Sequence, residues 1–166
     1  RSSTYKQDGI GKNRGWEYSR TGNPTRAALE KLIADLEQGK HGLAFASGLA
    51  AINTVLSLDK SGDKLVVSDN IYGGTFRILD NVFKNFNITY KIVDTSDLEA
   101  VENAIDDDVK AIYIETPANP LLTITDIEAV SKIGKKHNKL VIVDNTFLTP
   151  YLQRPLTLGA DIVIHS

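Results

Sequence analysis

Polar, small and aromatic residues follow the short apolar runs of this sequence, and chemistry is expected at these positions. They form five groups, at 47–49, 69–74, 115–120, 144–146 and 165–166. In an open parallel sheet, ligands bind outside the carboxyl ends of the strands. One polar strand end is explained by contact with water alone. Five on one sheet edge would indicate a ligand site.

Ser47 and Gly48 follow one apolar run and open a helical pattern over 49–58. Free N–H groups and the helix dipole would hold a phosphate there, and Gly48 would allow it to approach closely. A glycine turn into a helix is also common without any ligand. The sequence has neither GxGxxG nor GxxxxGK[ST], which argues against dinucleotide and nucleoside triphosphate binding.

Asp144 directly follows the apolar run 140–143, so a rigid strand would hold its carboxylate in a site that excludes water. A buried carboxylate is costly unless it meets a cation. Two interpretations remain open: Asp144 caps the following loop, or it pairs with a protonated ring nitrogen. Tyr72 precedes Gly73 and Gly74, which would leave room for a flat group beside its ring; an ordinary loop tyrosine is the alternative.

The sequence contains no motif for a metal site or for a serine nucleophile. His41, His137 and His165 lack metal-ligand spacing, so no metal site is predicted, and neither GxSxG nor HExxH occurs. The acidic run 106–108 is interpreted as a solvated turn.

Six short apolar runs predict the strands that must position these groups: 43–46, 64–68, 89–93, 110–114, 140–143 and 161–164. Because helical patterns lie between them, the sheet should be mostly parallel and covered on both faces. We therefore predict one three-layer α/β/α domain over residues 23–166. A non-periodic arm, 1–22, precedes it.

The predicted helices carry recognisable start signals. Asn23 and Pro24 open the first, which should end at Gly39. Ser-x-x-Glu from Ser96 and Thr-x-x-Glu from Thr125 resemble capping boxes and predict two further helix starts.

Composition excludes several classes of protein. The net charge is 19 − 21 = −2, which provides no basic field for nucleic acid or anionic lipid. No apolar run approaches the roughly 18 residues of a membrane span. Without cysteine there are no disulfides, thiolate zinc sites or cysteine nucleophiles, and nothing favours secretion, so we expect a cytoplasmic protein. The chain begins without methionine and stops after a β-branched run, which we interpret as a fragment.

Five segments together resemble the Cys/Met-metabolism family of enzymes that use pyridoxal 5′-phosphate (PLP). They are EYSRTGNPTR at 17–26, ASGL at 46–49, YGGT at 72–75, ETPANP at 115–120 and DNTF at 144–147. The match runs over 3–166 in the family's order and spacing, and it covers somewhat under half of a typical member. The resemblance implies the large domain of fold type I PLP enzymes.

The resemblance also implies which residues bind the cofactor's phosphate. The residues of the same subunit would be Ser47, Gly48, Leu49 and Ser166. Tyr18 and Arg20 match a pair that reaches the neighbouring subunit's phosphate, which implies a homo-oligomer, a dimer of dimers, with shared sites.

The same resemblance gives roles around the pyridine ring. Tyr72 would stack on the ring and help to move protons, and Asp144 would keep the ring nitrogen protonated. Thr146 would support the ring, and Asn119 would lie near the ring hydroxyl and the substrate carboxylate. The family's cofactor-binding lysine would stand three positions beyond Ser166. We therefore expect the 166-residue chain alone to be inactive.

The implied activity is γ-elimination of L-cystathionine to cysteine, 2-oxobutanoate and ammonia. The γ-synthase and β-lyase reactions of the family are alternatives, and Gly74 departs from the cysteine usual in methionine γ-lyases. A flavodoxin-like signalling module with Asp69 or Asp144 as phosphoryl acceptor is a different hypothesis. It would need an acidic cluster where Ser47 and Gly48 stand. A catalytically inactive interaction protein is a third.

Overall fold

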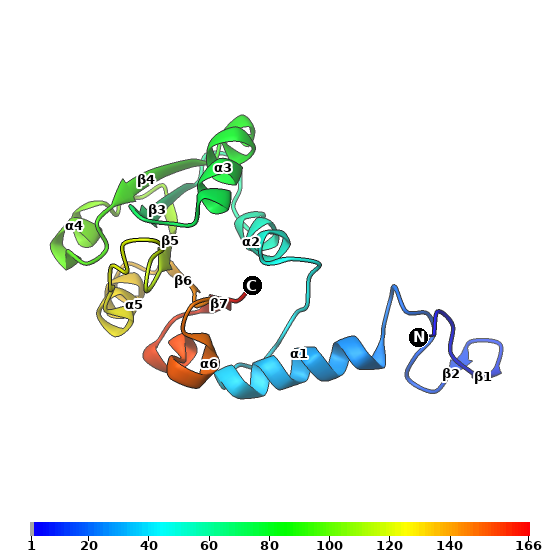
Figure 1. The fold of residues 1–166 in the computed structure, drawn as a ribbon. Coiled ribbons are helices and arrows are strands. Elements are labelled where there is room, and N and C mark those ends of the chain that lie inside the picture. Colours follow the sequence, from blue (N-terminus) through cyan, green and yellow to red (C-terminus); the bar gives the residue numbers. More distant parts are fainter. Residues whose placement is uncertain (1) are drawn as a thin grey trace. The chain divides into compact units, whose positions relative to one another are not determined.

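A computed structural model describes residues 2–166, so Arg1, the first residue of the predicted arm, lies outside the described residues (Figure 1). The chain divides into two compact units, one that ends at Ala44 and one that runs from Phe45 to Ser166. The boundary follows the first helix, whereas the predicted arm ends before it, at Gly22. Each unit is described by itself.

The first unit opens with a small hairpin where the sequence predicted no regular structure. Strands β1 (Gln7–Gly9) and β2 (Lys12–Asn13) pair antiparallel. The turn contains Gly11 at a φ of 69°, which glycine adopts without strain. An ion pair of 2.6 Å between Asp8 and Arg14 links the flanks. Strands this short do not display a two-residue period, so the pattern did not reveal them.

Helix α1 (Pro24–Glu37) begins as predicted. The Asn23 side chain accepts hydrogen bonds from the amides of Thr25 and Arg26, and Pro24 occupies the first turn. The helix ends two residues before the predicted Gly39, because Gln38 takes the left-handed conformation at a φ of 58°.

The second unit is built on a parallel sheet of order β4-β3-β5-β6-β7. Its strands are β3 (Lys64–Ser68), β4 (Thr89–Val93), β5 (Val109–Glu115), β6 (Leu140–Asp144) and β7 (Ile162–Ile164). Five of the six predicted strands are confirmed. The segment 43–46 is not a strand, and its Leu43 is 74% exposed. An apolar run becomes a strand only where a neighbour accepts its backbone hydrogen bonds.

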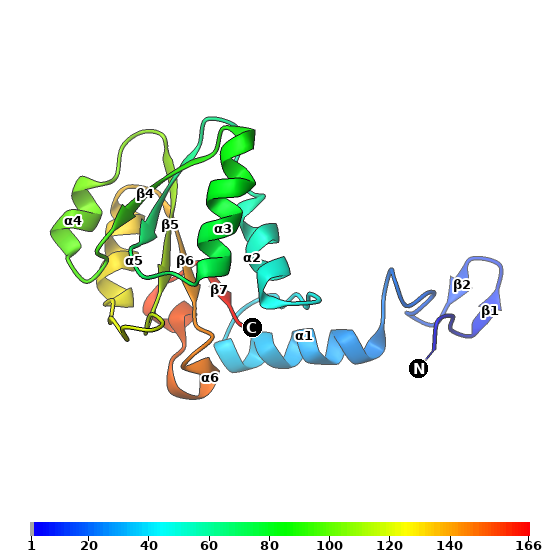
Figure 2. The ribbon, with the colours of Figure 1, turned by 45° about the horizontal axis from the view of Figure 1, so that its top comes forward.

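Helices cover both faces of this sheet, as predicted (Figure 2). Helices α2 (Gly48–Leu56) and α3 (Gly73–Asn81) pack on one face, and α4 (Leu98–Asn103) and α5 (Ile127–Lys136) on the other. Strand side chains alternate between them: Val67 joins the α2 and α3 core, and Val66 joins the α4 and α5 core. Each such fully buried aliphatic side chain contributes about 1.5–3 kcal/mol. The short helices η1 (Phe83–Phe86), α6 (Thr149–Leu152) and η2 (Pro155–Leu158) complete the unit.

The predicted capping boxes are wrong by one residue. Asp97 caps α4 and Asp126 caps α5, in place of Ser96 and Thr125. The Ser96 hydroxyl instead donates to Asp94 at 2.6 Å. Thr125 is buried, and its hydroxyl lies 2.7 Å from that of Thr95. Aspartate is as good an N-cap as serine, so the choice depends on competing partners.

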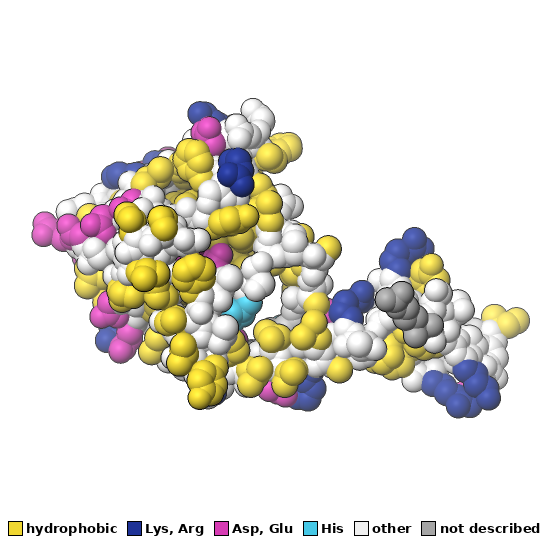
Figure 3. Space-filling view, in the orientation of Figure 1, with side chains coloured by type: hydrophobic (Ala, Val, Ile, Leu, Met, Phe, Trp, Pro, Cys, Tyr) yellow, Lys and Arg dark blue, Asp and Glu magenta, His cyan; other side chains and the backbone are white. Residues whose placement is uncertain are grey.

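The distribution of basic side chains on the surface agrees with the slightly negative net charge. Lys and Arg side chains are scattered over the face in Figure 3 rather than gathered in one patch. Within residues 2–166, none of the helices combines the length and the apolar character that a membrane span requires.

Asp59, in the turn before β3, gives a pH-dependent prediction. Burial, and then the charge of Asp63, raise the pKa of Asp59 to about 6, from an ordinary value of 3.8. The folded state therefore holds the Asp59 proton more tightly, and stability falls as pH rises from about 4 through 6. Asp59→Asn removes this half-buried charge and should therefore raise the free energy of unfolding at pH 7.5. Because solvent screens the group, the gain should be only about 1 kcal/mol.

Urea unfolding of the complete protein at pH 4 and pH 7.5 would measure this effect. The gain should nearly vanish at pH 4. An equal gain at both values would show that charge at Asp59 is not its cause.

Candidate active site

The five polar groups meet at the carboxyl edge of the sheet. Glu115 and Asp144 are neighbours in the register of β5 and β6, and Asp144 is paired with Ile164 of β7. The Tyr72 amide donates to Glu115 at 2.6 Å. Gly48 lies so close to Ser166 that a Cβ at Gly48 would overlap the serine side chain. Groups separated by up to 119 positions in the sequence thus form one candidate site.

Asp144 is the most constrained side chain of this site. It is 6% exposed, and its Oδ1 accepts hydrogen bonds from the Thr146 amide at 3.1 Å and hydroxyl at 2.6 Å. The Tyr113 hydroxyl donates to Oδ2 at 3.3 Å. Among residues 2–166, none of the ion pairs includes Asp144. A buried carboxylate oriented by three donors can receive a cation such as a protonated ring nitrogen. Asp144 also bonds its own loop through Thr146, as the capping interpretation expects, and its pairing with a ring nitrogen stays a prediction.

Tyr72 occupies the N-cap position of α3 and remains 47% exposed. Its ring lies against Gly74, where a Cβ would overlap it. The space that glycine leaves at this position is therefore filled by the Tyr72 ring itself, which corrects the expectation that Gly74 clears room for a ligand. A Cβ at Gly73 would meet the Arg77 side chain at 3.3 Å.

The start of α2 has the geometry of an anion site. Ser47 is extended, and its hydroxyl accepts the Ala50 amide at 3.1 Å, so it caps the helix. The other amides of a first turn have no partner within the helix. Gly48 is buried, Leu49 is half-buried, and Ser166 stands beside them at the end of the chain.

Gly48→Ala should weaken PLP binding by the complete protein at least about 10-fold. The new methyl group would displace Ser166 or shift the helix start, and either change would disturb the groups that are expected to bind the phosphate. A titration of the apoenzyme with PLP, followed by absorbance, measures the dissociation constant. Gly73→Ala is the matched control, because its methyl group meets only the flexible end of Arg77. Equal affinities of wild type and Gly48→Ala would contradict the prediction.

Two predicted site residues lie in the first unit. Tyr18 and Arg20 contact each other, with the guanidinium carbon 5.2 Å from the ring centre. Their contact with a neighbouring subunit's phosphate stays a prediction. Asn119, in contrast, lies in the second unit, four residues after the end of β5, with its side chain exposed.

Tyr113 and Glu115 are not among the predicted site residues. Burial, and then the charge of Asp144, raise the pKa of the Tyr113 hydroxyl well above its ordinary value, so it keeps the proton that it donates to Asp144. Glu115 is 8% exposed, and burial raises its pKa. Glu115 belongs to one of the five polar groups, so its position after a strand could have indicated a site residue. Tyr113 lies inside a buried strand, where nothing in the sequence indicates a site.

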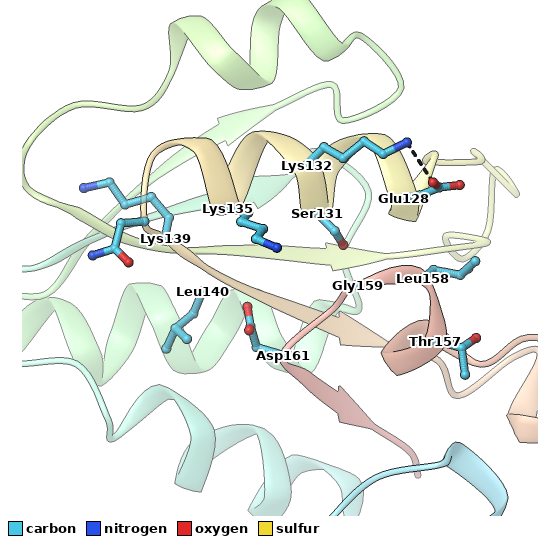
Figure 4. Close-up of a pocket in the computed structure, with 11 residues that line it drawn as sticks. Glu128, Ser131, Lys132, Lys135, Lys139, Leu140, Thr157, Leu158, Gly159 and Asp161 are labelled. Carbon is cyan, nitrogen blue, oxygen red and sulfur yellow. Dashed lines mark ion pairs between the residues drawn. The ribbon is translucent and has the colours of Figure 1, made fainter.

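A pocket of about 730 Å³ lies at the opposite end of the sheet (Figure 4). It is lined by residues of α5, by residues 138–140 and by Thr157, Leu158, Gly159 and Asp161. Its Lys132 is paired with Glu128 at 2.7 Å, and none of the predicted site residues reaches it. The pocket is therefore separate from the candidate site.

The parallel sheet with helices on both faces, the start of α2 against Ser166 and the buried Asp144 fit the class of PLP-dependent enzymes that the sequence resembles. The chain belongs to the family described as Cys/Met metabolism PLP-dependent enzyme, which matches residues 1–166. It resembles a cystathionine beta-lyase of Lactococcus lactis subsp. cremoris (57% identity, 99% of this chain, 43% of the relative) and a cystathionine gamma-lyase of Bacillus subtilis (57%, 99%, 43%). The crystal structure of cystathionine gamma-lyase from Lactobacillus plantarum complexed with L-serine superposes with a TM-score of 0.94, at 60% identity over 99% of this chain and 43% of that one. The chain thus spans about 43% of the length of these relatives.

Proposed function

We propose that the complete protein is a PLP-dependent lyase that cleaves L-cystathionine by γ-elimination to cysteine, 2-oxobutanoate and ammonia. The observation that carries the proposal is the buried Asp144, held by three hydrogen bonds and without a cation among the ion pairs of residues 2–166. A carboxylate held in this way fits PLP, whose pyridine nitrogen carries a proton that a carboxylate stabilises. PLP supplies an electron sink for the carbanion that elimination requires.

Each residue then has a task of its own. Asp144 holds the proton on the ring nitrogen, and Thr146 and Tyr113 hold Asp144 in place. The first amides of α2, with Gly48 and Ser166, bind the phosphate. Tyr72 stacks on the ring and moves protons.

The remaining residues act at the edge of the site. Asn119 binds the ring hydroxyl and the substrate carboxylate. Tyr18 and Arg20 reach the phosphate of a neighbouring subunit, in a dimer of dimers with shared sites. Arginine suits this task because its planar fork makes bidentate bonds to phosphate. The absence of cysteine supports a cytoplasmic location.

Two reactions of the same family are the alternative functions. Relatives named beta-lyase and gamma-lyase are equally similar to this chain, at 57% identity, and a cystathionine gamma-synthase of Mycobacterium leprae is 52% identical. Similarity over residues 1–166 therefore does not separate the three.

Product analysis on the purified complete enzyme with PLP would separate them. Cysteine and 2-oxobutanoate from L-cystathionine support γ-elimination, whereas homocysteine and pyruvate indicate β-elimination. Formation of cystathionine from cysteine and an O-acylated homoserine indicates the synthase. Absence of all three reactions would refute the proposed class.

A further inference from the structure

Glu115 has no role in cofactor binding or catalysis in the proposed function, yet its buried carboxylate makes a specific contact. It is the last residue of β5, is 8% exposed, and its Oε2 accepts the Tyr72 amide at 2.6 Å. The backbone of Asn119 also lies near enough to this carboxylate to lower its pKa. Bonds from amides to an ionised acceptor are about twice as strong as neutral ones. The loop that carries Asn119 begins directly after Glu115, so this buried side chain joins that loop to the one that carries Tyr72.

The start of α3 depends on this contact. Tyr72 stands in the N-cap position, but no side chain of its own segment caps the helix. Glu115, 43 positions away in the sequence, accepts the Tyr72 amide from the neighbouring strand. The Tyr72 ring, still 47% exposed, is thereby fixed through its backbone while its face stays accessible.

An apolar side chain would serve packing better at this position. Glu115 lies beside Asp144 in the register of two buried strands, so two carboxylates are neighbours in a site of low polarity. Burial, and then the nearby Asp144, raise the pKa of Glu115, while the amides of Tyr72 and Asn119 act in the opposite direction. Burial of the Glu115 carboxylate therefore costs free energy of folding, and its contacts are with the two loops.

We propose that Glu115 is a positioning residue, which locks the Tyr72 loop to the Asn119 loop and so sets the plane in which the Tyr72 ring meets the cofactor relative to Asp144. The effect on cofactor binding rests on the proposed function, whereas the lock itself does not. Both loops leave neighbouring strands at one edge, so a single acceptor between them can order both before any ligand binds.

The experiment uses the complete protein and two variants. Glu115→Met keeps the length of the side chain but has no acceptor, and Glu115→Gln keeps a neutral acceptor. Hydrogen exchange of the apoenzyme should quicken at least about 10-fold in peptides covering both 70–76 and 116–124 for Glu115→Met, and by less for Glu115→Gln. The PLP dissociation constant should rise in the same order, at least about 10-fold for Glu115→Met.

Asp161→Leu is the matched control. The Asp161 carboxylate also accepts a backbone amide, that of Val141 at 2.8 Å, but at the opposite end of the sheet. This variant should leave exchange in both loops and PLP affinity unchanged.

Each result supports the proposal or overturns it. Unchanged exchange in either loop of Glu115→Met overturns the lock. Faster exchange with unchanged PLP affinity overturns the positioning role. If Glu115→Met does not fold, Glu115→Gln decides, and wild-type exchange in its two loops overturns the proposal. If the wild-type protein itself does not bind PLP, the proposed function fails, while the exchange measurement still tests the lock.

Discussion

Asp144→Asn will reduce turnover of L-cystathionine by the complete enzyme about 100-fold to 1,000-fold and leave it folded. Asparagine has the same shape, and its carbonyl oxygen can still accept the hydrogen bonds of Thr146, while its NH2 group in the place of Oδ2 can only donate to the Tyr113 hydroxyl. It lacks the negative charge that, in the proposed function, keeps a proton on the ring nitrogen. Loss of one preorganised electrostatic contact in an active site typically costs about 2.7–4 kcal/mol of transition-state stabilisation.

Steady-state kinetics with saturating PLP, together with circular dichroism of the variant, would measure this loss. Asp69→Asn is the matched control. Asp69 is an exposed carboxylate just after β3, and the signalling-module hypothesis named it as a phosphoryl acceptor. It should retain wild-type turnover. Turnover of Asp144→Asn within a few-fold of wild type would show that the carboxylate does not hold the ring proton.

Mixing two inactive variants of the complete enzyme, one altered at Arg20 and one at Asp144, will restore activity. If Arg20 serves the neighbouring subunit's site, each mixed dimer contains one site with both defects and one with neither. Random exchange of subunits makes half of the dimers mixed, so about a quarter of the wild-type activity should return. Arg20→Lys alone should already weaken PLP retention, because an ammonium cannot form the bidentate contact.

The control for this experiment pairs Asp144→Asn with Gly48→Ala. Both residues lie in the second unit and are proposed for the same subunit's site, so no mixed dimer would have an intact site. Mass spectrometry would verify that mixed dimers have formed. Mixed dimers of the Arg20 and Asp144 variants without any activity would place Arg20 in its own subunit's site.

Most of the secondary structure followed from local patterns. Residues 140–143 and 111–114 are apolar on both faces, because helices cover the sheet on both sides, and such runs are recognisable without a structure. Asn23 and Pro24 likewise mark a helix start through bonds to amides two and three positions away. The true caps Asp97 and Asp126 were missed because adjacent polar residues compete for the same amides.

The sequence by itself determined the alternation of strands and helices, and with it the edge where Tyr72, Asp144 and Ser166 collect. That followed because consecutive parallel strands all end on one side of the sheet. Only the tertiary structure decided which side chains touch there. The bond from Tyr72 to Glu115 spans 43 positions, and that from Tyr113 to Asp144 spans 31, so no local period encodes either. Pairing also decided that 43–46 is not a strand, because a strand needs a neighbour, and hydrophobicity alone does not provide one.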